Sequence, residues 1–584
     1  MKILLTAINA KYIHSNLAVY SLKAYAKEYR ENIEIAEFTI NNQADYILEE
    51  IYKRKPDVLC FSCYIWNLSM IEEVMTEFHK LCPDVPIWVG GPEVSYEVEA
   101  FLQSHPEVTG IMMGEGEETF LELCDYYIND GGIKEGAKSL RAIKGIAFRA
   151  FEREEDNTIV NEWRSVMDMS TIPFCYDTLG DFSNRIIYYE SSRGCPFSCS
   201  YCLSSVDKKL RFRDLKLVKE ELQFFINQKV PQIKFVDRTF NCNHAHAMEI
   251  WKFIKEQDNG ITNFHFEVSA DLLNEEELAL MSTMRPGLIQ LEIGVQSTNE
   301  PTILEIKRTM KLDRLKEIVN RVKKYGNIHQ HMDLIAGLPY EDYTTFKKSF
   351  DDIYALRPNQ LQMGFLKVLK GSYMYDHAKE YEILYHDNPP YEVLSTKWLS
   401  FDDVLKMKRI EEMLEVYYNS GQFEIAMQAL SFCYESAFLM FERLGDFYER
   451  NHYFGMSHSR IKRCEIMLDF VKEEIANGVL KEETYDCMKE ALVFDLYYRE
   501  NCKSRPGWAV DASSFKTITH YYCKNGKMSH VEPFHYDFMH ITNGIPEYQE
   551  EVFWAHFSYE KRDPLSHQAE VVYVTPKVDM QVAE

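Results

Sequence analysis

The sequence predicts an α/β protein of three parts: a doubly wound Rossmann-like domain, a partial (β/α)6 barrel of the TIM type and a mainly helical domain. Short apolar runs alternate with amphipathic helical stretches twice, first up to about Arg149 and again from Arg185 to about Tyr375, which implies parallel strand pairing. Beyond that point mainly helical periodicity continues. Because 584 residues are too many for one compact core, we expect domains at 1–150, 185–375 and 376–584, with a linker at 151–184.

The first domain contains short apolar runs that predict strands, at Ile3–Ile8, Asp57–Ser62, Pro86–Val89 and Gly110–Met113. Helical patterns alternate with them, at Ser15–Tyr29, Met70–Leu81 and after Thr119. Doubly wound sheets bind ligands beyond the carboxyl ends of their strands. The loops 62–67, 90–95 and 114–117 fall there, and their glycines would let the backbone approach a bulky ligand closely.

The second domain follows a polar, acidic stretch at 152–161 and the segment 167–177, which we interpret as a linker. Six strands are predicted after it, at Ile186–Glu190, Gln232–Val236, His265–Ser269, Ile289–Val295, His331–Ile335 and Leu361–Leu366. Six such units favour a partial barrel with its chemistry at the carboxyl ends of the strands.

The last domain has four stretches of helical periodicity that are rich in Met, Phe and Tyr, at Phe401–Tyr418, Gln422–Leu444, Ser459–Ile475 and Glu482–Tyr498. Its tail, with Tyr521-Tyr522 and the β-branched run Val571–Thr575, predicts a return to strand. We expect this domain to cap the barrel mouth. Its cysteines lack the tight spacing of a second cluster: Cys433, Cys464, Cys487, Cys502 and Cys523.

The composition is that of a globular protein with a net charge of −26, which argues against broad binding to nucleic acids or anionic membranes. The densest basic stretch, at 208–213, is expected to be a solvated rim, although one such patch could suffice for RNA. No apolar run approaches the roughly 20 residues of a membrane span, and the start of the chain reads as a strand. We therefore expect a cytoplasmic protein with reduced thiols and one metal site.

The strongest motif comes directly after the first barrel strand, where Cys195, Cys199 and Cys202 have C-x3-C-x2-C spacing. Thiolates are the usual ligands of iron–sulfur clusters, and three of them leave one iron of a [4Fe–4S] cube open for a substrate. Gly194 and Pro196 suit a tight loop. The alternative is a zinc site, whose fourth ligand would have to be Cys242, His244 or His246. Asn243 is better interpreted as a helix N-cap with both histidines in the first turn.

The motif and the strands that follow resemble the radical S-adenosylmethionine (SAM) superfamily over about 185–375. The resemblance is carried by 236–238 on the second strand, 266–269 on the third, Leu291–Ser297 on the fourth and Asp333–Pro339 on the fifth. It implies a [4Fe–4S] cluster and SAM as cofactors. The SAM contacts that it implies are Tyr201, Asp237, Glu267, Glu292, Gln296, Ser297, Arg308, Gly337 and Leu338. For Arg308 the alternative is a surface charge.

A doubly wound domain before such a barrel resembles the cobalamin-binding class of that superfamily. The resemblance implies cobalamin contacts at Asn9, Ser62, Tyr64, Trp66, Asn67, Gly90, Gly91, Pro92, Glu93, Gly114, Glu115, Gly116 and Glu117. No D-x-H-x-x-G motif supplies a histidine for cobalt, so the alternative is a generic nucleotide-binding or structural domain. We expect His14 to be a hydrogen-bonded loop residue rather than a metal ligand, and Cys60 and Cys63 to be core thiols rather than a redox pair.

The resemblance implies a methyltransferase in which a 5′-deoxyadenosyl radical activates an unactivated carbon and methylcobalamin supplies the methyl group. A one-electron donor such as flavodoxin or ferredoxin would reduce the cluster. The same cofactors could instead serve cyclisation, rearrangement or oxidation. A non-catalytic corrinoid or redox sensor is a third possibility. The SAM-facing strand motifs argue against it, because a sensor would not need them. A methylthiotransferase is disfavoured because its extra cluster and RNA-binding domain are not visible. The substrate is not specified by these patterns.

Overall fold

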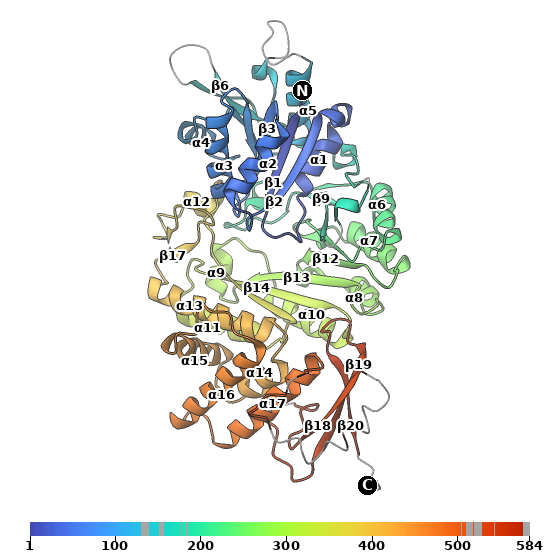
Figure 1. The fold of residues 1–584 in the computed structure, drawn as a ribbon, viewed down its shortest axis with the longest axis vertical. Helices are drawn as coiled ribbons and strands as arrows, with labels where there is room; N and C mark the ends of the chain where they lie inside the picture. The colour runs from blue at the N-terminus through green and yellow to red at the C-terminus, as the bar shows by residue number, and fades with distance from the viewer. Residues whose placement is uncertain are drawn as a thin grey trace.

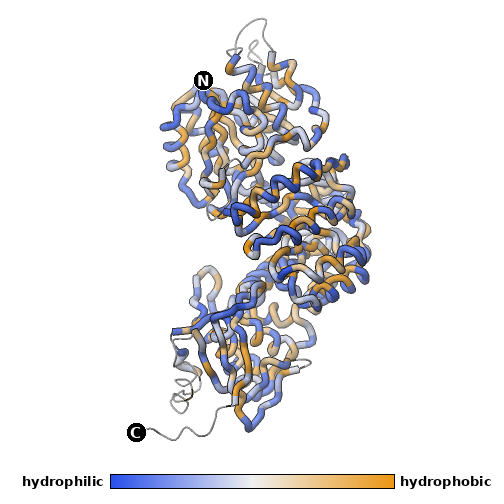
Figure 2. Tube along the Cα trace, turned by 90° about the vertical axis from the view of Figure 1, so that its right-hand side faces the viewer, coloured by the Kyte–Doolittle hydropathy of each residue, from blue (hydrophilic) through white to orange (hydrophobic). Residues whose placement is uncertain are grey.

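The computed structural model describes residues 1–129, 139–150, 157–176, 178–182, 185–503, 505–509, 518, 528–541 and 544–575. The N-terminal sheet, the barrel and the C-terminal region follow one another along the long axis of the molecule (Figure 1). Hydrophobic and hydrophilic residues alternate along the helices of all three parts (Figure 2), as expected where one helix face packs on a core. The α/β class and the order of the three parts are thus confirmed.

The N-terminal sheet has seven strands in the order β2-β1-β3-β4-β5-β6-β7, of which the first five are parallel and the last two antiparallel. Their bounds are β1 Ile3–Asn9, β2 Ile33–Thr39, β3 Val58–Ser62, β4 Ile87–Gly90, β5 Gly110–Met112, β6 Ile146–Ala150 and β7 Asn157–Val160. Every residue of β1 and β3 is buried, as in central strands covered on both faces. Strand β7 lies within the range that we expected to be a linker.

Helices cover both faces of this sheet, with bounds α1 Leu17–Tyr25, α2 Ala44–Arg54, α3 Leu68–Leu81, α4 Val98–Ser104 and α5 Glu117–Ile128. Alternate residues of β1 enter two different cores. Leu4 and Ile8 pack with α2, α3 and α4 on one face, whereas Leu5 packs with α1 and α5 on the other. This is the doubly wound arrangement that the sequence predicts. The helix expected at Ser15–Tyr29 is shorter, because a 3-10 turn replaces it at Lys27–Asn32.

The barrel sheet has six parallel strands whose spatial order is their order in the chain, β8-β11-β12-β13-β14-β15. They are β8 Ile187–Tyr189, β11 Gln232–Phe235, β12 Asn263–Val268, β13 Ile289–Gln296, β14 His329–Ala336 and β15 Gln360–Phe365. Its outer helices are α6 Leu215–Asn227, α7 His244–Glu256, α8 Glu275–Met281, α9 Glu300–Glu305, α10 Leu312–Tyr325 and α11 Tyr343–Tyr354. Each strand matches one of the six predicted, so the partial (β/α)6 barrel is confirmed.

The C-terminal region is mainly helical, with α13 Phe401–Met413, α14 Glu424–Ser431, α15 Ala437–Arg450, α16 Arg460–Ala476 and α17 Glu483–Arg499. The stretch Gln422–Leu444 is two helices rather than one, because Ser436 accepts a hydrogen bond from the Leu439 N–H and starts a new helix. An antiparallel sheet follows, with β18 Ser529–Phe534, β19 Phe553–Arg562 and β20 Ala569–Val574. Strand β20 confirms the strand predicted at Val571–Thr575, while Tyr521-Tyr522 lies outside the described residues.

Most of this region does not cap the barrel mouth, contrary to our expectation. Its helices share one continuous core with the barrel, where Phe350 of α11 packs on Phe438 of α15. Pro564 and Leu565 lie beside Gly287, which precedes β13 and therefore marks the amino end of the barrel strands. Residues 371–399, which we call the mouth segment, do lie at the carboxyl ends of the strands, where Met374 donates a backbone hydrogen bond to Ser200. The mouth segment contains α12 Tyr373–Asp376, β16 Leu384–Tyr385 and β17 Val393–Ser395.

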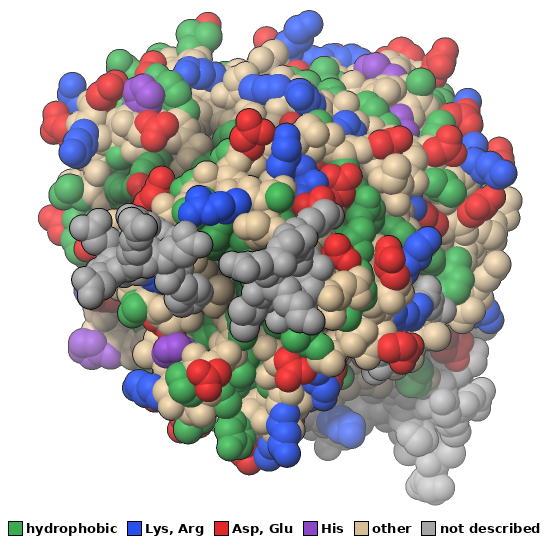
Figure 3. All heavy atoms as spheres, turned by 90° about the horizontal axis from the view of Figure 1, so that it is seen from above, with side chains coloured by type: hydrophobic (Ala, Val, Ile, Leu, Met, Phe, Trp, Pro, Cys, Tyr) green, Lys and Arg blue, Asp and Glu red, His purple; other side chains and the backbone are tan. Residues whose placement is uncertain are grey.

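The surface charges are mixed. Seen from above the N-terminal sheet, acidic and basic side chains are interspersed (Figure 3). The basic stretch at 208–213 is only partly the solvated rim that we expected. Lys208 and Lys209 are exposed, whereas Arg213 is buried and forms an ion pair with Glu221, and Arg211 pairs with Glu115 and Asp207. Among the described residues, no helix combines the length and the apolar character that a bilayer crossing requires.

Candidate active site

The three cysteines lie on one tight loop between β9 Ser192–Arg193 and a 3-10 turn at Leu203–Ser205. Gly194 has a φ of +87°, and a Cβ there would come within 2.6 Å of the Lys209 carbonyl oxygen, so the loop requires glycine. Cys195 and Cys199 are buried, Cys202 is half-buried, and none of them forms a disulfide. Burial raises the pKa of the Cys195 thiol, and the nearby Cys202 and Cys199 raise it further. The three thiols thus lie on one loop, near enough for Cys199 and Cys202 to act on Cys195.

The surroundings of this loop fit a bound group. Arg308 places its Nη1 3.7 Å from the Cys199 Sγ and 3.3 Å from the Tyr201 hydroxyl. The Arg308 Nε, the Gln296 Oε1 and the Ser200 Oγ are buried without a hydrogen-bond partner. Buried polar atoms normally have partners, so these three atoms indicate a polar ligand beside the thiols. The alternative of a surface charge for Arg308 is wrong.

The two histidines that could have completed a zinc site form other contacts. Asn243 caps α7 by accepting the His246 N–H, as predicted. The His246 Nε2 lies 3.1 Å from the Ser191 hydroxyl, and the His244 Nδ1 lies 2.9 Å from Glu277. Cys242 remains near Cys195, but burial raises the pKa of its thiol to about 11, to which Cys195 also contributes. Both histidines are thus engaged away from the three thiols.

Several residues with expected SAM contacts are engaged elsewhere. Asp237 accepts hydrogen bonds from the Ser191 N–H and hydroxyl and from the Ser192 hydroxyl, at 2.9, 2.7 and 2.5 Å. It therefore orders the strand end that leads into the cysteine loop. Ser297 donates to Glu341 at 2.6 Å. Leu338 is buried in an apolar cluster with the mouth segment, and Gly337 faces Val393 of that segment.

Glu267 and Glu292 face the barrel lumen on neighbouring strands, where they are direct partners in the β12–β13 register. Burial raises the pKa of Glu267 to about 7, against the opposing charge of Arg238. Burial would also raise the pKa of Glu292, but the nearby His265 ring and the Lys234 charge outweigh it and hold the pKa well below its usual value. Two neighbouring carboxyls with pKa values pushed apart are typical of a functional site.

The glycine-rich loops lie at the carboxyl ends of β3, β4 and β5, as predicted. Gly91 has a φ of +117°, and a Cβ there would overlap the Cys63 carbonyl oxygen. The rings of Tyr64 and Trp66 stack at 4.4 Å, and Trp66 is partly exposed. The Glu93 Oε2 is buried without a hydrogen-bond partner. A glycine turn, a stacked aromatic pair and a carboxyl oxygen without a hydrogen-bond partner together fit a large planar ligand with polar edges.

Two other predicted cobalamin contacts, Asn67 and Asn9, form hydrogen bonds that stabilise the loops. Asn67 donates to the Ile8 and Ser62 carbonyls at 2.9 and 3.0 Å, and Asn9 donates to Glu37 at 2.9 Å. The predictions for three neighbouring side chains are confirmed. His14 bonds to the Tyr188 hydroxyl at 2.6 Å, and Cys60 and Cys63 are buried core thiols. Burial raises the pKa of Cys60 to about 12, so this thiol carries little thiolate near neutral pH.

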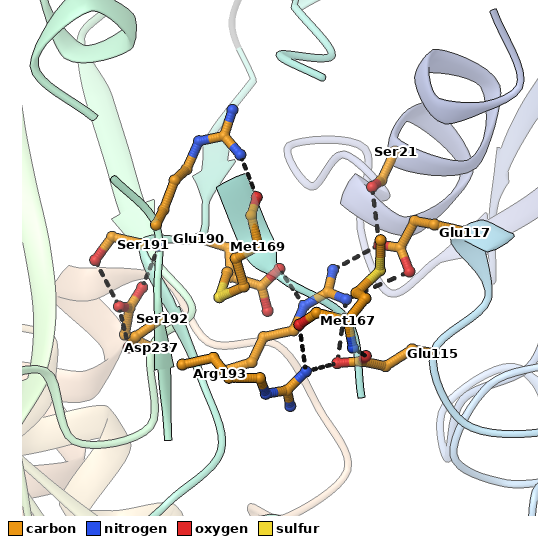
Figure 4. A network of polar contacts seen from close by, with 12 residues as sticks. Ser21, Glu115, Glu117, Met167, Met169, Glu190, Ser191, Ser192, Arg193 and Asp237 are labelled. Atoms are coloured by element: carbon orange, nitrogen blue, oxygen red, sulfur yellow. Dashed lines mark hydrogen bonds and ion pairs between the residues drawn. The ribbon is translucent and has the colours of Figure 1, made fainter. Parts of the chain in front are cut away.

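Glu115 and Glu117 connect the glycine-rich loops to the cysteine loop (Figure 4). Arg193 lies 2.6 Å from Glu117, 3.3 Å from Glu115 and 2.9 Å from Glu190. Glu117 also accepts a hydrogen bond from Ser21 at 3.0 Å. Burial would raise the pKa of Glu117, but the Arg193 charge and hydrogen bonds hold it below its usual value. We call Arg193, Glu115, Glu117 and Glu190 the interdomain ion cluster.

Sequence reasoning missed Arg193 and Glu190 of this cluster, as well as the lumen residues His265, His331 and Asp333. Arg193 directly precedes Gly194 and could have been flagged as a cation beside a metal loop. The i, i+2 spacing of His331 and Asp333 on a predicted strand also places both on one face. Their partners lie on other segments, which no local pattern shows.

Three family models match the chain: the B12 binding domain at 3–124, the radical SAM superfamily at 189–353 and a protein of unknown function, DUF4080, at 379–573. The chain therefore combines a B12 binding domain with a radical SAM domain, followed by a DUF4080 region. The radical SAM domain implies a [4Fe–4S] cluster and SAM, and the B12 domain implies cobalamin. A radical SAM domain also requires a reductant.

Among curated relatives, the cobalamin-dependent radical SAM methyltransferase TokK of Streptomyces tokunonensis is 26% identical over 53% of this chain and 45% of TokK. The anaerobic magnesium-protoporphyrin IX monomethyl ester cyclase of Rubrivivax gelatinosus is 21% identical over 55% of this chain and 58% of the cyclase. The chain thus spans about half the length of these relatives. The radical SAM methyltransferase TsrM of Kitasatospora setae shares the fold, with a TM-score of 0.54 and 15% identity over 67% of this chain and 79% of TsrM.

Proposed function

We propose that this protein is a cobalamin-dependent radical SAM methyltransferase. It would methylate an unactivated carbon of a substrate bound between the glycine-rich loops of the N-terminal sheet and the cysteine loop. One observation carries the proposal. The loops at the carboxyl ends of the N-terminal sheet and the cysteine loop face each other and are joined by the interdomain ion cluster. A methyl donor and a radical initiator would have to share one cavity, and this arrangement supports that.

Within the proposal, Cys195, Cys199 and Cys202 hold the cluster, while Tyr201, Gln296 and Arg308 bind SAM. The glycine-rich loops and Trp66 hold cobalamin. When bound, these groups supply radical formation from SAM and a transferable methyl group. Arg308 would orient an anionic group of SAM, because its guanidinium lies beside the Cys199 thiol and its buried Nε has no hydrogen-bond partner.

The rest of the chain contributes placement, a proton site and exclusion of water. Glu267 can hold or release a proton near neutral pH, since its pKa is about 7. The mouth segment covers the carboxyl ends of the strands, where Tyr375 donates to Glu97 at 2.6 Å. We further propose that the protein works in the cytoplasm with a one-electron donor such as flavodoxin or ferredoxin.

The test has two parts. Anaerobically reconstituted protein should cleave SAM reductively and show corrinoid absorbance, and the Cys199→Ala variant should lose the cleavage but keep the corrinoid. With deuterated-methyl SAM and cobalamin, a cell extract should then contain a product heavier by one labelled methyl group. Full SAM cleavage by Cys199→Ala would refute the site, and absence of label in any product would refute methyl transfer.

The second candidate is cyclisation or oxidation with the same cofactors, which the likeness to the protoporphyrin ester cyclase favours. The same experiment separates the two functions. A cyclase would cleave SAM and produce 5′-deoxyadenosine while its product gained no labelled methyl group.

A further inference from the structure

The barrel lumen contains a row of ionisable side chains that the proposed methyl transfer does not use. Glu292 on β13 and His331 on β14 are direct register partners, so their side chains lie side by side. Asp333 is two residues further along β14 and therefore points to the same face. His265 reaches the row from β12, on the other side of Glu292.

The ligand atoms in this row lie close together. One nitrogen or oxygen atom each of Glu292, His331 and Asp333 falls within 4.8 Å of the others. The His331 Nε2 is 3.1 Å from the Asp333 Oδ1, and the His265 Nε2 is 2.9 Å from the Glu292 Oε2. Ligands bound about 2.0–2.2 Å from one metal ion are themselves about 3 to 4 Å apart. The 3.1 Å between His331 and Asp333 lies in this range, and the 4.8 Å limit for all three atoms requires only a small closure around an ion.

The directions of these atoms support the same conclusion. Neither close contact has hydrogen-bond geometry, and the His265 Nε2, the His331 Nε2 and the Asp333 Oδ1 are all buried without a hydrogen-bond partner. The two histidines are 6% and 8% exposed. Each ring nitrogen is buried near a carboxylate but does not point at it. The direction in which the nitrogen could bind a ligand, in the plane of the ring, is therefore unoccupied by that carboxylate. Metal ligands have this relation, because they aim at a common ion and not at each other.

The charges around the row leave one of its carboxylates without a cationic side chain. Lys234 lies 2.9 Å from the Glu292 Oε2 and neutralises one carboxylate. Asp333 remains, and Glu267 stands in register beside Glu292. One imidazole and two carboxylates form a mixed nitrogen and oxygen donor set, which suits borderline divalent ions.

We propose that Glu292, His331 and Asp333 bind a divalent transition-metal ion such as Mn²⁺, Fe²⁺ or Zn²⁺ in the barrel lumen, apart from the cysteine loop, with His265 beside Glu292. Three protein ligands would leave a six-coordinate ion three positions for oxygen or nitrogen donors of a molecule in the lumen. The site does not depend on methyl transfer, so a failure of either proposal leaves the other standing.

The test uses full-length protein loaded with its cluster and cobalamin, and Mn²⁺ as the probe. Free Mn²⁺ is followed by electron paramagnetic resonance during a titration. We expect one ion per chain in the native protein, displaced by Zn²⁺, and at least tenfold weaker binding in the double variant His331→Gln/Asp333→Asn. The matched control is His530→Gln, which removes a histidine 2.8 Å from a buried Glu532 in the C-terminal region and should bind as the native protein does.

Iron content and corrinoid absorbance of each variant report whether it is folded. A second measurement needs no variant: bound Mn²⁺ should show nitrogen couplings from imidazole in pulsed resonance spectra. No saturable uptake by the native protein, unchanged binding in the double variant, equal loss in the control or bound Mn²⁺ without nitrogen couplings would each overturn the proposal.

Discussion

Replacing Arg193 with Gln should destabilise the N-terminal part of the molecule more than any surface change. The substitution leaves the Glu117 side chain, which is 5% exposed, and its neighbour Glu190 without their cation, whereas Glu115 keeps Arg211. Breaking a buried ion pair from one side costs about 3–5 kcal/mol, because the remaining charge stays buried and uncompensated. For a domain of 150–250 residues, each kcal/mol shifts the melting temperature by roughly 2–4 °C. The expected shift near neutral pH is therefore roughly 6 to 20 °C.

The stability difference between the native protein and the variant should depend on pH. In the native protein the pKa of Glu117 is lowered. Its contribution to the free energy of unfolding is therefore present above the unfolded-state pKa and is lost as the pH falls through the folded-state pKa. Without Arg193, burial dominates and the pKa of Glu117 should be raised. Its contribution is then present below the unfolded pKa and is lost as the pH rises through the raised value. The difference between the two proteins should be small near pH 4.5 and full by pH 7.5.

Differential scanning calorimetry of the cofactor-free full-length chain at these two pH values measures both effects. The control is Lys53→Gln, which removes a cation from an exposed pair with Glu49 and Glu50 and should leave the transition in place. Equal melting temperatures at pH 7.5, or a shift of the same size at both pH values, would refute the reasoning.

Three further predictions concern other parts of the chain. Gly91→Ala should weaken cobalamin binding, measured by corrinoid absorbance after dialysis, since its Cβ would overlap the Cys63 carbonyl; full retention would contradict the role of this turn. Phe350→Ala should cost about 3–5 kcal/mol in urea unfolding, because its ring is fully buried against Phe438 and Phe441, whereas Phe401→Ala on the surface should cost little. Burial raises the pKa of Glu341 to about 7, so its contribution is present below the unfolded pKa and is lost as the pH rises through 7. Glu341→Gln should therefore gain stability relative to the native protein between pH 5 and 8, by up to about 3 kcal/mol, and a pH-independent difference would exclude this titration.

Much of the fold could be predicted because burial on both faces leaves a simple signal. The six barrel strands and the four predicted N-terminal strands are mostly apolar runs, and all ten were located. Strand β2 was missed: it lies at the sheet edge, and four of its seven residues are only half-buried. Strand β7 is an edge strand inside a polar stretch. Edge strands need less apolar surface, so their patterns resemble those of loops.

In the candidate site, too, some contacts could be predicted from the sequence and others could not. The cysteine loop, the turn at Gly194 and the cap at Asn243 were predicted, because their contacts join residues a few positions apart. The engagement of Asp237 with Ser191, of Ser297 with Glu341 and of Arg308 with Cys199 joins residues 46, 44 and 109 positions apart. Such pairs are outside the reach of local spacing.

By itself, the sequence determined which elements form and where the thiol loop lies, since hydrophobic period, turn residues and ligand spacing act over a few neighbouring residues. Only the tertiary structure decided which charges are paired. Arg193 and Glu117 are 76 residues apart, and they meet because two sheets place their carboxyl ends against each other. Glu292, His331 and Asp333 likewise meet through strand register, which is set by packing of the whole barrel and not by any one segment.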